Sequence, residues 1–199
     1  MTKLEMLERL DSELVKGCQK CGLCNSRKTT VFGEGSPNAT VMFVGEAPGQ
    51  NEDEQGRPFV GAAGNLLDGM ISACGWKREE VYIANPLKCR PPGNRTPTDA
   101  ELTACQPYLE LQIKVINPRY IVCLGRVAAR WFFPQETRGI SGLNGRLRPW
   151  NGRKVLVTYH PSYILHSDTD EEANKKKLLV WNDLQVLLAD MRAETANSK

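Results

Sequence analysis

The sequence has no long hydrophobic run and no large excess of charge of either sign. No stretch approaches the roughly 18 apolar residues of a membrane-spanning helix. Lys and Arg outnumber Asp and Glu by only 26 to 23, so an anionic partner would have to be bound by a local basic patch. The charged N-terminal stretch 1–17 lacks the apolar segment of a signal peptide. We therefore expect a cytoplasmic protein with reduced thiols.

Internal repeats, long linkers and a GxxxxGK[ST] loop are also absent, and the missing loop leaves a nucleotide hydrolase or kinase without support. At 199 residues, 41% hydrophobic and 25% charged, the chain has the composition of a compact globular protein. We expect one domain over residues 1–199. Residues 1–35 are expected to pack on an α/β core, and residues 195–199 to be disordered.

Four short apolar runs rich in β-branched residues predict the strands of a parallel sheet covered on both faces. They span residues 40–45, 81–85, 120–125 and 154–159. Helical patterns alternate with them or follow them at residues 62–75, 97–116, 125–133 and 171–194. This alternation predicts an α/β fold in which a central four-stranded parallel sheet lies between layers of helices.

Unusual residues gather after the ends of these predicted strands, where open α/β sheets bind their ligands. The small residues of 45–49 let a ligand approach the backbone, and Phe59 follows between glycines as a possible stacking surface. Asn85 offers a donor and an acceptor on one edge, as recognition of an imide requires. His160, one of two histidines, opens a loop stiffened by Pro161. Taken alone, each feature also has a plainer explanation. Residues 45–49 are typical of a tight turn, Phe59 of a core side chain, Asn85 of a cap or turn, and a lone histidine of a surface position.

Basic side chains occur near the same loops. Individually each is a weak signal, but together they could contact the phosphates of a nucleic acid. They are Lys88, Arg90, Arg95, Arg146 and Arg148.

Seven cysteines in a reducing compartment favour metal ligation or packing over disulfides. Cys18 and Cys21 form a CxxC turn that supplies two thiolates, and a complete site needs more. Cys89 and Cys105, separated by 15 residues, are the best partners. Four thiolates suit a structural zinc or a [4Fe–4S] cluster equally well on spacing alone.

The other cysteines have less claim to such a site. Cys24 competes for a place because it continues the spacing of the CxxC turn. Cys74, at a helix end, and Cys123, inside a strand, are typical of free cysteines that pack as small hydrophobic residues.

Taken together, these motifs resemble those of the family 4 uracil-DNA glycosylases, the iron–sulfur branch of that superfamily. The similarity covers nearly the whole chain, and its most specific parts are GExPGxxEDxxGxPFVG and KCRPPxNRxP. The matching segments are CxxC at 18–21, VFGEG at 31–35, VGEAPGQNEDEQGRPFVGAAGNLLD at 44–68, VYIANPLKCRPPGNRTP at 81–97, YHPSYIL at 159–165 and VWNDLQ at 180–185.

The resemblance implies a three-layer uracil-DNA glycosylase-like fold and a [4Fe–4S] cluster in place of zinc. Its ligands would be Cys18, Cys21, Cys89 and Cys105, which leaves Cys24 outside. The implied substrate is uracil-containing DNA, single- or double-stranded, and we expect a monomer that binds no membrane. A sliding-clamp partner cannot be read from the sequence.

The resemblance also assigns the uracil site. Phe59 would stack on the base, Asn85 would bond its N3–O4 edge and His160 would face O2. Catalysis would use His160, Glu46 and Asn85. The pocket would consist of Gly45, Glu46, Ala47, Glu52, Phe59, Asn85 and His160. Contacts to DNA would come from Arg90, Arg95, Ser162, Tyr163 and Ile164, the last three pressing into the minor groove while the base is flipped out.

Two features of the sequence bear on mechanism. Ala47 stands where the best-known uracil glycosylases have an aspartate that orients water, so we expect a dissociative reaction with water positioned by Glu46 or by backbone. A related branch attaches covalently through a histidine that residues 137–150 lack, so we expect turnover. The alternative is a non-catalytic iron–sulfur protein that binds DNA or accompanies a polymerase.

Overall fold

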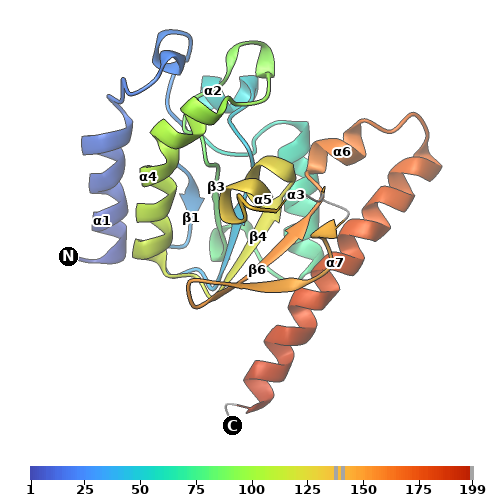
Figure 1. The fold of residues 1–199 in the computed structure, drawn as a ribbon. Helices are drawn as coiled ribbons and strands as arrows, with labels where there is room; N and C mark the ends of the chain where they lie inside the picture. Colours follow the sequence, from blue (N-terminus) through green and yellow to red (C-terminus); the bar gives the residue numbers. More distant parts are fainter. Residues whose placement is uncertain (137–138, 140–141, 198–199) are drawn as a thin grey trace.

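The computed structural model describes residues 1–136, 139 and 142–197, which form a three-layer α/β fold (Figure 1). The central sheet has the strand order β1-β3-β2-β4-β6-β5. β2, β3, β4 and β6 are mutually parallel along this order, as the sequence predicts. The strands span β1 Glu34–Gly35, β2 Val41–Val44, β3 Tyr82–Ala84, β4 Tyr120–Leu124, β5 Leu147–Trp150 and β6 Arg153–Thr158.

The four predicted parallel strands are present, and in the described part of the chain the sheet is wider than predicted, because an antiparallel strand borders it on each side. β1 pairs with β3, and β5 pairs with β6. β1 contains only Glu34 and Gly35, so its sequence carries no apolar alternation, and Gly35 adopts φ +124°. β5 contains Pro149 and is only partly buried. Both are edge strands, which pairing with a neighbour defines more than local sequence does.

The predicted helices are all present, and shorter ones join them. Thr2 and Thr98 begin α1 and α4 with capping boxes. The sequence analysis did not predict the short helices α2 and α6. The helices are α1 Lys3–Leu10, η1 Asp11–Val15, η2 Gly22–Asn25, α2 Gln50–Gln55, α3 Ala62–Ala73, η3 Arg78–Glu80, η4 Pro92–Asn94, α4 Asp99–Ile116, α5 Arg126–Phe132, α6 Pro161–Leu165 and α7 Asp170–Asn197.

The last helix is longer than its sequence pattern predicts. α7 continues to Asn197, so residues 195–197 of the tail expected to be disordered are helical, and positions 198 and 199 lie outside the described residues. In the part of the chain that the structure describes, no helix is both long enough and apolar enough to cross a bilayer.

Each face of the sheet carries its own hydrophobic core. On one face, Leu7 of α1, Leu109 of α4 and Phe132 of α5 pack with strand residues, which places the N-terminal helix on the α/β core (Figure 1). On the other face, Leu67 of α3 and Leu184 of α7 form the second core. The sheet is therefore buried on both sides, as its nearly continuous apolar strands predict.

The register of the parallel strands brings their carboxyl ends to one edge. Val44 lies opposite both Ala84 and Cys123, and Leu124 lies opposite Thr158. The residues that follow each strand are therefore neighbours in space. Because β2 lies between β3 and β4, the chain reverses direction across the sheet here, at the kind of switch point where α/β proteins bind ligands.

Candidate active site

A cavity of about 480 Å³ opens at this edge of the sheet. Loops after all four parallel strands line it, so the topology brings together residues far apart in the sequence. Its lining includes most residues of the predicted uracil pocket, namely Glu46, Ala47, Glu52, Phe59, Asn85 and His160.

The Phe59 ring forms one wall of the cavity and lies close to the His160 ring. Their ring centroids are 5.7 Å apart, with an angle of 32° between the planes. The Phe59 ring also lies against Gly45, where an added Cβ would come within 2.5 Å of Phe59 Cζ. Glycine at position 45 therefore lets the ring and the first loop pack together.

Asn85 presents an unsatisfied polar atom at the same place. Its side chain is buried, with 2% exposure, and among the described residues its Oδ1 has no hydrogen-bond partner. A buried amide oxygen without a partner is costly, which makes it a good candidate for contact with a ligand. The amide can offer an acceptor and a donor side by side to a planar imide.

The His160 ring is held in one tautomer by the start of α6. Its Nδ1 accepts the Ser162 backbone N–H at 3.1 Å and lies 2.8 Å from the Ser162 hydroxyl. Because a backbone N–H can only donate, the proton of the neutral ring is assigned to Nε2. Burial lowers the pKa of His160 to about 4, with the charge of Glu52 opposing part of the shift. His160 is therefore a neutral hydrogen-bond donor near neutral pH.

The imidazole of His160 is expected to show no titration from about pH 5 to 8 and to protonate near pH 4. Because its pKa in the folded chain is below the ordinary 6.5, the unfolded chain binds this proton more readily. The contribution of the His160 imidazole to the free energy of unfolding should therefore decrease as the pH falls from 6.5 to about 4. Imidazole ¹⁵N NMR, assigned with His166→Gln, measures this directly, and a midpoint near pH 6.5 would contradict it.

Glu46 is a second titratable group in the lining of the cavity whose pKa is shifted. Burial raises the pKa of its carboxyl group, and the positive charge of Arg126 opposes part of this shift. Ala47, beside it, has no polar side chain. The attacking water would therefore have to be held by Glu46, by a backbone atom or by a residue from another loop.

The sequence analysis did not assign several of the residues that line the cavity. Asn94, Arg126 and Tyr159 all contribute to its wall. Asn94 has a positive φ of 56°, and its Oδ1 accepts a hydrogen bond from Arg90 Nε at 2.7 Å. The turn-forming letters PPGNR were the available signal for Asn94. For Arg126 and Tyr159 the signal was their position directly after a predicted strand or at its end.

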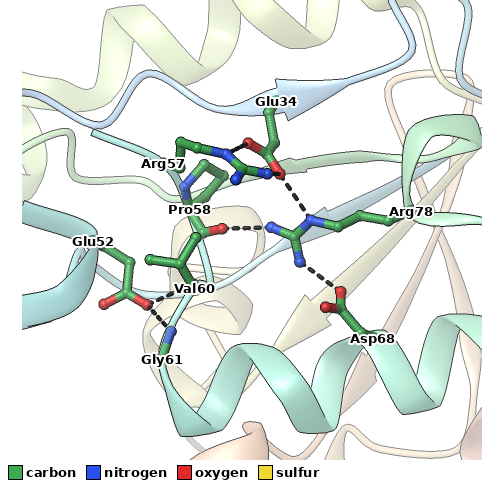
Figure 2. Close-up of polar contacts among 8 residues, drawn as sticks. All are labelled: Glu34, Glu52, Arg57, Pro58, Val60, Gly61, Asp68 and Arg78. Carbon is green, nitrogen blue, oxygen red and sulfur yellow. Dashed lines mark hydrogen bonds and ion pairs between the residues drawn. The ribbon is translucent and has the colours of Figure 1, made fainter. Parts of the chain in front are cut away.

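Glu52 lines the cavity, but its carboxylate is engaged with the loop that carries Phe59. Its Oε1 accepts the backbone N–H groups of Val60 and Gly61 at 2.9 and 3.0 Å (Figure 2). Its Oε2 accepts the Gly49 N–H at 3.1 Å. These bonds organise the pocket wall, in contrast to the direct uracil contact expected from the resemblance.

The prediction that Lys88 could contact phosphates was wrong. Lys88 is completely buried, and its Nζ donates to Phe32 O, Asn85 O and Gln112 Oε1 at 2.6–2.9 Å, so it cannot meet a phosphate. Arg95 lines the cavity and forms a two-pronged ion pair with Glu101.

The loop after β6 exposes a different apolar side chain from the one expected. Ile164 is 5% exposed and packs in the core that α3 and α7 share, so the expectation that it enters the minor groove does not fit this conformation. Helix α6 turns Tyr163 and Leu165 outward instead, with 40% and 46% exposure. Ser162 faces the cavity and bonds His160.

The four cysteines predicted as ligands line a second cavity. Cys18, Cys21, Cys89 and Cys105 come from the N-terminal segment, the loop after β3 and helix α4. Cys24 is not part of this lining, and its Sγ lies 3.5 Å from Asn25 Oδ1. Cys123 is buried in the sheet and Cys74 packs beside the second core.

Three of these sulfur atoms each have a hydrogen-bond donor nearby. Arg27 Nη1 lies 3.1 Å from Cys89 Sγ, the Tyr108 hydroxyl 3.0 Å from Cys18 Sγ, and the Lys88 backbone N–H 3.3 Å from Cys105 Sγ. Such donors suit thiolate ligands, which are negatively charged. Within the described residues, no group of three or more His, Cys, Asp or Glu side chains is arranged to hold a single metal ion. The chemistry of the donor set nevertheless fits a thiolate-bound group.

Residues 32–185 match the family model described as the uracil DNA glycosylase superfamily. The match includes the sheet strands and every element that lines the larger cavity. The fold and the site together thus define the class of protein.

Several curated proteins are similar over most of the chain. The type-4 uracil-DNA glycosylase of Thermotoga maritima is 46% identical over 92% of this chain and 94% of its own. Those of Sulfurisphaera tokodaii and Saccharolobus solfataricus are each 45% identical, over 82% and 81% of this chain and 78% and 79% of theirs. The chain belongs to the uracil-DNA glycosylase superfamily and, within it, to the type-4 uracil-DNA glycosylases.

Proposed function

We propose that this protein removes uracil from DNA by hydrolysing the N-glycosidic bond, which leaves an abasic site. The observation that carries the proposal is that Phe59, Asn85 and His160 line one cavity although they lie on three separate loops. A stacking surface, an amide edge and an imidazole donor are the groups that a uracil ring requires. Family membership agrees with this chemistry.

Asn85 selects the base in this proposal. Its free Oδ1 accepts the uracil N3–H, and its amide N–H donates to O4. Cytosine presents the reverse pattern at these two positions, so it leaves both protein groups unpaired. Phe59 stacks on one face of the ring and the backbone of the first loop lies beside it.

His160 supports bond cleavage. In a dissociative reaction the leaving uracil acquires negative charge at O2, and a donor already aimed there stabilises the transition state. The neutral His160 provides Nε2–H for this purpose, since Nδ1 is occupied by Ser162. Water then attacks the sugar, positioned by Glu46 or by backbone.

The DNA reaches the cavity with its target nucleotide flipped out. Arg95, which lines the cavity, and Arg90, which bonds Asn94 in its wall, contact phosphates and so hold the strand in register. The outward-facing Tyr163 and Leu165 occupy the gap in the base stack, in place of the buried Ile164. We propose that the enzyme acts as a monomer on single- and double-stranded DNA.

Incubation with single-stranded DNA that contains one uracil, followed by alkali, tests the function. Scission at the uracil position, together with free uracil in the supernatant, is the expected result. The matched strand with thymine at that position is the control. Binding of the uracil strand without scission would instead indicate the non-catalytic DNA-binding alternative.

We further propose that Cys18, Cys21, Cys89 and Cys105 hold a [4Fe–4S] cluster. Two observations support it: the four thiols line one cavity, and donors surround three of the sulfur atoms. When bound, the cluster supplies a cross-link between the N-terminal segment, the loop after β3 and helix α4. Arg90 follows Cys89 directly and Arg95 lies in the same loop, so this cross-link holds the loop that contacts DNA.

The purified protein is expected to contain about four irons per chain and to absorb broadly in the visible range. Cys89→Ser should lose most of this iron, because it removes a ligand that lies in the second cavity. Cys24→Ser is the matched control and should retain it. Anaerobic preparation followed by metal analysis measures both variants. One zinc per chain, or loss of iron from Cys24→Ser, would contradict the assignment.

A further inference from the structure

Phe59 has a backbone conformation that its own side chain disfavours. Its φ is +51°, in the left-handed region where residues with a Cβ are uncommon and aromatic residues are outliers. Such a conformation persists only when the surrounding structure holds it, and it is typical of functional sites. The groups that hold Phe59 therefore determine where the wall of the cavity lies.

Both peptide groups that flank Phe59 are bound by buried or half-buried side chains. On the C-terminal side, Glu52 accepts the N–H groups of Val60 and Gly61. On the N-terminal side, Arg78 Nη2 donates to the carbonyl oxygen of Pro58 at 2.5 Å (Figure 2). Phe59 thus lies between an anionic and a cationic anchor.

Arg78 is itself firmly placed. Its Nε donates to Glu34 Oε1 of β1 at 2.8 Å, and its Nη1 donates to Asp68 Oδ1 of α3 at 2.6 Å (Figure 2). All three nitrogen atoms of the guanidinium group are therefore used, and its side chain is only 20% exposed. The planar fork joins the Pro58 carbonyl to a strand and a helix, which a single ammonium group could not do.

The backbone and the ring of Phe59 are both closely packed, so a shift of the backbone is passed on to the ring. An added Cβ on Gly64 would come within 2.0 Å of the Phe59 carbonyl oxygen, so α3 already presses against this backbone. The Phe59 ring itself lies against Gly45, and its centroid is 5.7 Å from that of the His160 ring. A shift of the Pro58 carbonyl would therefore move the ring relative to the cavity.

We propose that Arg78, outside the cavity, is a positioning residue that sets the Phe59 ring for stacking on uracil. This inference rests on the proposed function, since it concerns the base that the cavity binds. Arg78 does not touch the base, and it acts through the Pro58 carbonyl. Arg78 binds the peptide group before Phe59, and Glu52 binds the peptide group after it.

Arg78→Gln and Arg78→Lys are expected to weaken the binding of free uracil and to lower the single-turnover rate by ten- to a hundredfold, since misplacement of about 1 Å has effects of this order. Arg57→Gln is the matched control. Arg57 also pairs with Glu34, but its side chain is 59% exposed and it forms no bond to the Pro58 carbonyl. It should keep wild-type uracil affinity. Affinity for DNA without uracil should be unchanged in all three variants.

A double-mutant cycle with Phe59→Leu shows whether Arg78 acts through the ring. If it does, Arg78→Gln should have little further effect on uracil affinity in the Phe59→Leu background. Thermal unfolding identifies variants that merely lose stability, and all binding is measured well below their unfolding midpoints. Wild-type uracil affinity in folded Arg78→Gln, or full additivity in the cycle, would overturn the proposal. Failure of the wild-type protein to release uracil would instead overturn the proposed function.

Discussion

Replacing His160 with alanine is expected to lower the single-turnover rate of uracil excision by roughly two to three decades. The reason is that, in the proposed mechanism, Nε2–H is aimed at charge that develops on uracil only as the bond breaks, and only such differential binding accelerates the chemical step. DNA affinity should change little, because the substitution leaves in place the arginine loop that we propose contacts phosphates. Rates are measured with enzyme in excess, and affinity is measured with an uncleavable strand.

A different role for His160 gives a different pattern. His160 also begins α6, which carries the exposed Tyr163, so alanine could act by loosening this short helix. In that case the defect should largely disappear on single-stranded DNA, where less energy is needed to extrude the base. Equal defects on single- and double-stranded substrates support the electrostatic role. A defect confined to duplex DNA would assign His160 to base extrusion.

Asn85→Asp is expected to reduce uracil excision by two or more decades. The substitution replaces the amide donor with a carboxylate oxygen that faces uracil O4, and it leaves a negative charge in a site where Asn85 is 2% exposed. Loss of one donor that faces developing charge typically costs about 3 to 4 kcal/mol in the transition state, which corresponds to that loss of rate. The measurement is the single-turnover rate of uracil release at neutral pH.

The matched comparison is Asn85→Ala, which removes both polar groups without adding a charge. It should be impaired because uracil O4 and N3–H lose their partners, but less than the aspartate variant. The wild-type enzyme should leave unmodified cytosine in place on the same strand. Excision of cytosine by the wild type, or full activity of Asn85→Asp, would contradict the proposed reading of the imide edge.

Much of the fold follows from local patterns. The four parallel strands and their intervening helices were predicted within a few residues, because apolar runs and helical periodicity are properties of neighbouring residues. The edge strands β1 and β5 were not, because pairing with β3 and β6 defines them. Asn94 could likewise have been indicated by its turn motif, and Tyr159 by its place directly before His160.

The sequence by itself determined the parallel α/β architecture, the set of four cysteines and the loops that carry Phe59, Asn85 and His160. Only the tertiary structure decided which side chains are free to act. Lys88 and Ile164 are typical of surface contacts by their position in loops, yet packing buries both. Conversely, Arg78 and Glu52 hold the Phe59 loop through bonds to its backbone. Burial and such long-range hydrogen bonds depend on residues distant in the chain, so no local pattern encodes them.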